Sequence, residues 1–200
     1  MEALSDGVFA IAITLLVLEI SVPPGSGDDL LRAFLNQWPS YLAYVVSFAT
    51  IGGVWLGHNV ITESLHQADA RLIRLNLLLL MVVSFLPFPT RLLAEYIRES
   101  GPERVAATVY GLTLLAAAGL VSALWRYALR QGLIHPDADD ADVRMLTRRL
   151  APGLAGYVVL IVVGLFLPMV AVFGYLAIAV NLLIPVRRRS GSRQAHTDAG

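Results

Sequence analysis

The chain has 200 residues, of which 56% are hydrophobic and only 15% are charged, and its mean hydropathy is +0.67. This composition excludes an ordinary soluble domain and indicates an integral membrane protein with several spans. The formal net charge is zero and there is no cysteine, so neither a nucleic-acid partner, a disulfide framework nor a thiolate metal site is expected.

The first predicted span, residues 4–22, is apolar but contains polar groups that a simple anchor does not need. It ends at a Pro-Pro-Gly sequence and is long enough to cross a hydrocarbon core of about 30 Å. It nevertheless carries Asp6 near its start, Thr14 in its middle and Glu19 near its end. Because a charged group inside hydrocarbon is costly, these residues indicate a functional segment.

One face of this predicted helix is aliphatic. Ile11, Leu15 and Leu18 are spaced at i, i+4 and i+7 and therefore share a face, and Thr14 lies beside them. A narrow aliphatic stripe with one hydroxyl fits either a seam between packed helices or the wall of a tight, dry pore. The residues alone leave both interpretations open.

The remaining elements are predicted in chain order from hydropathy. They are an amphipathic helix over residues 28–37, spans over 39–62, 72–93 and 105–125, and a long apolar run over 150–186. We expect the third span to kink or end at Pro87-Phe88-Pro89, and the long run is broken at Pro168. Arginines at 148–149 and 187–189 flank that run and should both face the cytoplasm, so the run must cross twice. The predicted fold class is therefore all-α, with six transmembrane helices.

Charge orients this six-span arrangement. All fifteen basic residues are arginine. Eleven of them fall on the side of the two termini: Arg71, Arg74, Arg126, Arg130, Arg144, Arg148, Arg149, Arg187, Arg188, Arg189 and Arg193. The opposite side has only Arg32, Arg91, Arg98 and Arg104. The positive-inside rule then places both termini in the cytoplasm. We expect a transmembrane domain over residues 1–186 and a basic, disordered cytoplasmic tail over 187–200. The acidic stretch 137–142 is interpreted as a solvated loop, because its spacing is not that of an EF-hand calcium site.

Motifs for enzymatic chemistry are absent from the sequence. There is no Walker loop, no zincin motif and no nucleophile elbow, and the Thr-Val-Gly-Tyr-Gly filter of ordinary potassium channels is also missing. We therefore expect no catalytic residues, no cofactor and no resident metal.

Asp6 and His58 are the two ionisable residues that we expect at a similar depth on the cytoplasmic side. A carboxylate beside an imidazole offsets part of the burial cost of both groups. The pair could belong to a network that fixes the first helix, or it could relay protons, since histidine titrates in the physiological range. We favour the structural network.

Three segments carry a family resemblance. The sequence Ser-Asp-Gly-Val-Phe-Ala-Ile-Ala-Ile-Thr-Leu-Leu-Val-Leu at 5–18 resembles the first helix of prokaryotic relatives of the lysosomal potassium channel transmembrane protein 175. Trp-Leu-Gly-His-Asn at 55–59 is similar to that family's second-helix motif. Asn76, followed by Leu-Pro-Phe-Pro-Thr at 86–90, is similar to its third helix. The sequence departs from the pattern at Leu4, where the family usually has phenylalanine.

The resemblance implies a homotetrameric, potassium-permeable channel in the bacterial plasma membrane, with a central pore lined by the first helix of each subunit. Its constriction would be formed by the side chains of Ile11, Leu15 and Leu18, with Thr14 in the narrow path. Such a filter, which lacks carbonyl groups, should discriminate potassium from sodium only modestly. Glu19 would either gather cations at the pore mouth or mark the membrane interface. Potassium would be the only metal ion involved, as the permeant species.

The resemblance further implies a set of residues that hold the first helix in place, namely Ser5, Asp6, Trp55, His58 and Asn59. Two alternatives remain from other functional classes. One is a proton-coupled secondary transporter that uses Asp6 and His58, and the other is a non-conducting membrane scaffold in which the polar residues only join helices.

Overall fold

The computed structural model describes residues 2–21, 29–135 and 153–183. Within these ranges the regular structure is helical, apart from one isolated β-bridge between Leu65 and Ile134. The elements are α1 (Glu2–Leu15), a 3₁₀ turn η1 (Leu16–Glu19), α2 (Leu30–Asn36), α3 (Trp38–Glu63), α4 (Ala70–Phe85), α5 (Pro87–Tyr96), α6 (Pro102–Arg130), the helix Gly153–Gly164 and α8 (Pro168–Leu183). The prediction of an all-α fold is confirmed.

Within the described residues, three helices are long and apolar enough to cross a membrane. They are α3, the continuous stretch Ala70–Tyr96 that contains α4 and α5, and α6. The helix Gly153–Gly164 and α8 are apolar but shorter. The described part of the chain is thus all-helical, and three of its helices have the length and composition of membrane spans.

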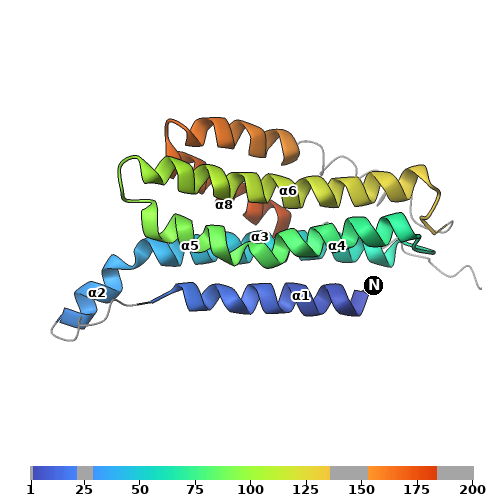
Figure 1. The fold of residues 1–200 in the computed structure, drawn as a ribbon, viewed down its shortest axis with the longest axis horizontal. Coiled ribbons are helices and arrows are strands. Elements are labelled where there is room, and N and C mark those ends of the chain that lie inside the picture. The colour runs from blue at the N-terminus through green and yellow to red at the C-terminus, as the bar shows by residue number, and fades with distance from the viewer. Residues whose placement is uncertain (1, 22–28, 136–152, 184–200) are drawn as a thin grey trace, which may run out of the picture.

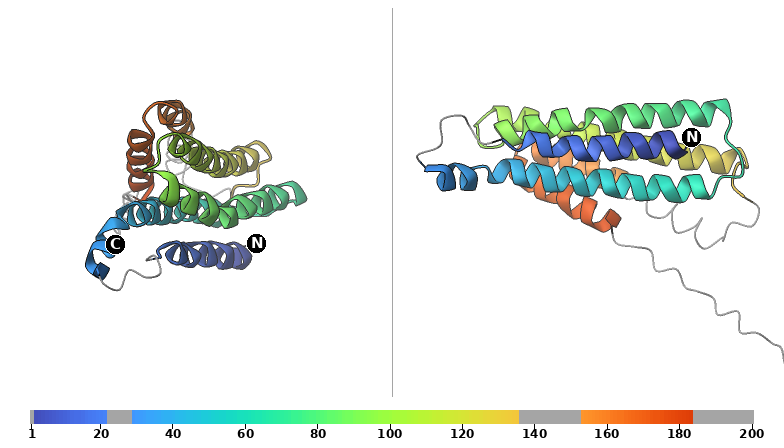
Figure 2. Two further views of the ribbon diagram at one scale, coloured as in Figure 1. Left: turned by 60° about the vertical axis from the view of Figure 1, so that its left-hand side comes forward. Right: turned by 90° about the horizontal axis from the view of Figure 1, so that it is seen from below.

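The bundle is organised around α3, which packs against α1, α5, α6 and α8. The long helices run nearly side by side, and α2 projects at an angle from one end (Figure 1). In contrast to α3, α1 lies at the margin of the bundle, where it contacts α3 and α4 (Figure 2). One side of α1 is therefore available to the surroundings of the subunit.

Proline residues set several helix boundaries. α4 ends at Phe85 and α5 begins at Pro87, as expected for a residue that lacks an amide hydrogen. α8 begins at Pro168, so the long apolar run is divided as predicted.

α6 continues to Arg130, beyond the predicted end of the span at 125. In this last part of the helix Arg126 is exposed and Ala128 is buried. The predictions for 137–142 and for the tail 187–200 lie outside the described residues.

The end of α6 is closed by a glycine in the left-handed region. Gly132 has φ 65°, a conformation that costs glycine little. The Leu133 amide bonds the Ala128 carbonyl at 3.0 Å, and the Gly132 amide bonds the Leu129 carbonyl at 3.3 Å. This is the Schellman pattern, which ends the helix and turns the chain back toward the end of α3.

Candidate pore helix and its support

The buried face of α1 is formed by residues spaced four, three and four positions apart. Ser5, Phe9, Ala12 and Leu16 each expose 1% or less of their surface. This spacing follows the helical period, so the four side chains form one stripe directed at α3 and α4. The stripe fixes the rotation of α1 about its own axis.

The opposite face of α1 and η1 is aliphatic and exposed. Ile11 is 60% exposed, Leu15 41% and Leu18 69%. Thr14 is exposed beside them, and its hydroxyl donates to the Ile11 carbonyl at 2.9 Å. The predicted stripe is thus brought together on one side of the helix, and the threonine hydroxyl is satisfied within the helix itself.

A buried amide connects the inner face of α1 to two other helices. The Asn76 Nδ2 group donates to Ser5 Oγ at 3.0 Å, and Asn76 Oδ1 lies 2.7 Å from His58 Nε2. All three residues are at most 2% exposed, and the His58 ring packs 5.5 Å from the Phe9 ring between centroids. In this way α1, α3 and α4 are joined by hydrogen bonds between buried side chains. Loss of one of these bonds would leave a buried polar group without that partner.

A second contact holds the start of α1. The Trp55 indole Nε1 donates to Asp6 Oδ1 at 2.9 Å. The Asp6 carboxylate is therefore hydrogen-bonded to an indole, while the His58 imidazole is bonded to Asn76. Asn59 lies apart from this group, since its Nδ2 donates to Glu63 Oε1 at 3.0 Å within α3.

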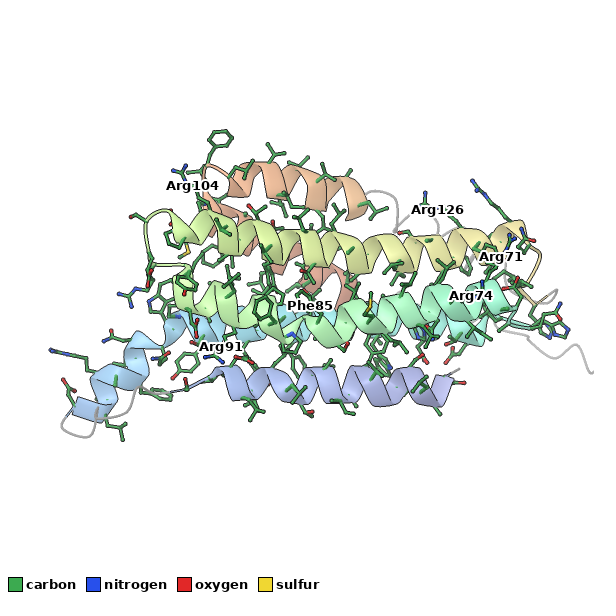
Figure 3. The ribbon with its side chains drawn as sticks, viewed as in Figure 1. Arg71, Arg74, Phe85, Arg91, Arg104 and Arg126 are labelled. Atoms are coloured by element: carbon green, nitrogen blue, oxygen red, sulfur yellow. The ribbon has the colours of Figure 1, made fainter. Side chains whose placement is uncertain are left out.

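At the far end of the helix, Glu19 is tied to α5 by an ion pair. Arg91 Nε lies 3.9 Å from Glu19 Oε2 and 2.8 Å from Glu95 Oε1. Figure 3 shows that Arg91 extends from α5 on the side of the bundle where α1 lies. The positive charge of Arg91 is thus shared between the carboxylates of Glu19 and Glu95.

Sequence reasoning did not include Asn76 among the support residues. Asn76 nevertheless belongs to the third-helix segment that carries the family resemblance, which was the available signal for it. A separate cluster of three hydroxyl groups was also absent from the predicted residues. Ser47 Oγ lies 2.7 Å from Thr90 Oγ1 and 2.8 Å from the Tyr110 hydroxyl, which joins α3, α5 and α6.

Comparison with known proteins gives consistent matches. A family model described as "Endosomal/lysosomal potassium channel TMEM175" matches residues 1–87. A potassium channel of Streptomyces collinus is 48% identical over 159 residues, which cover 78% of this chain and 77% of that protein. A potassium channel of Chamaesiphon minutus is 46% identical over 160 residues, with coverage of 77% and 78%.

A solved structure and a more distant relative extend the comparison. The crystal structure of a lysosomal potassium-selective channel TMEM175 homolog from Chamaesiphon minutus superposes with a TM-score of 0.82 at 38% identity, covering 90% of this chain and 93% of that one. The endosomal/lysosomal proton channel TMEM175 of Gallus gallus is 34% identical over 149 residues, but this match covers only 30% of its length.

These matches agree with the all-helical bundle, the apolar spans and the motifs on the first three helices. The proteins that the chain matches are ion channels of the membrane rather than enzymes. The chain belongs to the TMEM175 family of potassium channels.

Proposed function

We propose that the chain is one subunit of a homotetrameric, potassium-permeable channel whose central pore is lined by α1. Ile11, Leu15 and Leu18 of four copies would form successive narrow rings, with Thr14 between the first two. The observation that carries this proposal is the exposed aliphatic stripe of α1, which lies opposite a face fixed by buried hydrogen bonds.

The polar support of α1 favours a pore over an aliphatic face that only contacts lipid. Lipid tails interact equally well with every apolar face of a helix, so lipid contact alone does not require α1 to have a fixed rotation about its own axis. A pore does require one, because the same side chains must face the axis in every subunit. The contacts of Ser5 and Asp6 to α3 and α4 supply that constraint.

The proposed rings would act through hydration. A ring of isoleucine or leucine closes by losing its water, and it passes an ion only when it is wide enough to keep part of the hydration shell. Aliphatic carbons have a weak field, so discrimination between potassium and sodium would be modest. Glu19 would lie at the mouth beyond Leu18, where Arg91 and Glu95 set its net effect on cations.

Arginine distribution supports an orientation for the subunit. Arg71, Arg74 and Arg126 lie toward the end of the bundle where α1 begins, while Arg91 and Arg104 lie toward the other end (Figure 3). By the positive-inside rule, the start of α1 would face the cytoplasm of a bacterial cell. Six spans with both termini inside fit this arrangement.

A proton-coupled transporter is the second candidate, favoured by the buried histidine beside the start of α1. A relay through Asp6 and His58 would need each residue to exchange its proton during transport. The hydrogen bonds to Trp55 and Asn76 argue for fixed roles, because both would have to break in every cycle.

Reconstitution separates the two candidates. Purified protein in liposomes with an outward potassium gradient should release potassium passively, whether or not a proton gradient is imposed. Empty liposomes are the control for leakage. Potassium flux that strictly requires a proton gradient, or proton movement in fixed ratio to potassium, would identify the transporter. Absence of flux in protein of demonstrated fold would identify the scaffold.

A further inference from the structure

A pocket of about 320 Å³ lies where the connection between α5 and α6 meets the turn that precedes α8. The first segment contributes Ile97, Arg98, Glu99 and Glu103 to its lining, and the second contributes residues 166–170. Both segments lie at the end of the bundle away from the start of α1 (Figure 1). The volume is within the range of small-ligand sites, and none of the residues assigned to the proposed pore lines this pocket.

The first segment brings groups of both charges to the pocket. Glu103 lies in the first turn of α6, and its Oε2 atom is buried without a hydrogen-bond partner among the described residues. The start of a helix favours a negative charge, but burial of this oxygen without a donor costs free energy that a bound cationic group would offset. Arg98 is exposed and forms no ion pair with another described residue. The pocket therefore offers a guanidinium to an anion and a carboxylate to a cationic donor.

The second segment is apolar and exposed. Phe166 is 73% exposed, Leu167 57% and Val170 53%. α8, which follows this turn, packs against α3 and α6 on the side of the bundle away from α1 (Figures 1 and 2). If α1 lines a central pore, this side faces the surrounding lipid. Large apolar side chains beside charged groups at the end of the bundle fit an amphiphile of the membrane.

We propose that this pocket binds the headgroup of an aminophospholipid of the phosphatidylethanolamine type. The Arg98 guanidinium would receive the phosphate, since arginine forms strong charge-assisted hydrogen bonds with phosphate oxygens. The primary ammonium of the lipid would donate to the Glu103 carboxylate and offset its charge. The acyl chains would lie beside Phe166 and Val170. One bound lipid would in this way connect the segment between α5 and α6 with the turn before α8.

The mixed charge of the pocket selects among phospholipid headgroups. Phosphatidylglycerol has a phosphate but no ammonium, so it would leave Glu103 without a cationic partner. Phosphatidylcholine carries a positive charge, but its quaternary ammonium has no hydrogen atom to donate. Phosphatidylethanolamine supplies both the anion and the N–H donors. Free phosphoethanolamine has the same charged groups but would lose the apolar contacts with residues 166–170.

Native mass spectrometry of the purified full chain counts bound lipids and tests this selection. With three lipids of the same acyl chains at equal concentration, phosphatidylethanolamine should be retained about tenfold more than phosphatidylglycerol or phosphatidylcholine, because each of these lacks a hydrogen bond to a charged group. Equal retention of the three lipids would overturn the proposal, and this comparison needs no variant. Free phosphoethanolamine that binds as tightly as the lipid would show that the site does not recognise a membrane lipid.

Two substitutions test the headgroup contacts separately. Glu103→Gln keeps the shape of the side chain but removes its charge, so it should abolish the preference for phosphatidylethanolamine over phosphatidylcholine. Arg98→Gln should weaken the binding of all three lipids about tenfold, because all three carry a phosphate. Arg104→Gln is the matched control, since Arg104 is exposed on α6 next to Glu103 but does not line the pocket. Circular dichroism establishes that each variant is folded. Folded Glu103 and Arg98 variants that bind the lipids as the original chain does would contradict the assigned contacts.

Discussion

At the scale of single residues, Asn76 joins three helices because one amide can donate and accept at the same time. Its Nδ2 group serves Ser5 on α1 and its Oδ1 serves His58 on α3. Neither partner has access to water at this depth.

Substitution of Asn76 by alanine should therefore destabilise the bundle. It leaves the Ser5 hydroxyl and the His58 ring without this partner, and we expect a loss of about 1–3 kcal/mol in the free energy of unfolding. Thermal unfolding in detergent measures this loss. Asn59→Ala is the matched control, because Asn59 bonds only along its own helix to the exposed Glu63, and it should cost less than about 0.5 kcal/mol. Equal losses would contradict the role assigned to Asn76.

A second prediction at this scale concerns the constriction. Ile11→Asn should let water remain in the proposed ring, which raises potassium conductance and lowers discrimination against sodium. Ile13→Asn is the matched control, because Ile13 packs against the core of the subunit. Both variants place an amide in an apolar setting, so similar losses of stability are expected. Liposome flux or single-channel recording compares them, and equal changes in conductance would mean that the stripe does not line the pore.

At the scale of elements, the start of α4 depends on one carboxylate. Asp69 caps the helix by accepting from the Leu72 amide at 2.7 Å, and the Tyr127 hydroxyl of α6 donates to its other oxygen. Because the Tyr127 hydroxyl and the Leu72 amide both stabilise the ionised form, they hold the pKa of Asp69 below its usual value. The start of α4 and the end of α6 are thus joined by a side-chain hydrogen bond.

This lowered pKa gives stability a defined dependence on pH. The contribution of the Asp69 carboxylate is fully present above its unfolded pKa of about 3.9, and it is lost as the pH falls through the lower folded pKa. Asn is also a good helix cap, so Asp69→Asn removes the titration and keeps the cap. The thermal midpoint of the original chain should exceed that of the variant by a constant amount from pH 7 to 5, and the gap should shrink below about pH 4. A gap that stays constant down to pH 3 would rule out this linkage.

The ends of several helices could be predicted from the chemistry of single residues, whereas the hydrogen-bond partners of side chains could not. Proline breaks at Pro87 and Pro168 are local consequences of a missing amide hydrogen, so the sequence predicts them well. The partner of Asp6 depends on how α1 and α3 are rotated, which span prediction leaves undetermined. The expected similar depth in the membrane suggested His58 as the partner of Asp6. The hydrogen bond is instead made by Trp55, which lies about one turn earlier on the same face of α3. Asn59 follows His58 in the motif and yet points about 100° away around the helix.

At the scale of the whole molecule, the marginal position of α1 predicts contacts between copies. If four copies surround one axis through this helix, then Leu15 of one subunit faces Leu15 of its neighbours. The chain has no native cysteine, so Leu15→Cys introduces a unique thiol. Oxidation in liposomes should link subunits through this residue, as seen by non-reducing electrophoresis.

The neighbouring residue supplies the control for this cross-link. Leu16 is completely buried within its own subunit, so Leu16→Cys should remain unlinked under the same conditions. Linking of both variants to the same extent would indicate random collision. Exclusively monomeric protein in mild detergent and in lipid would contradict the tetramer itself.

The 3₁₀ turn at the end of α1 changes how successive rings would be spaced. In a 3₁₀ turn, residues three positions apart point in the same direction and lie about 6 Å apart along the axis, whereas an α-helix separates them by about 4.5 Å and rotates them by about 60°. Leu15 ends α1 and Leu18 lies within η1, so the 3₁₀ geometry would bring the directions of the two side chains closer together than a continuous α-helix does. In the proposed tetramer, the space between the Leu15 ring and the Leu18 ring would admit a layer of water. A potassium ion would then give up and recover its solvent shell in two steps, each with a smaller barrier than one unbroken dry passage.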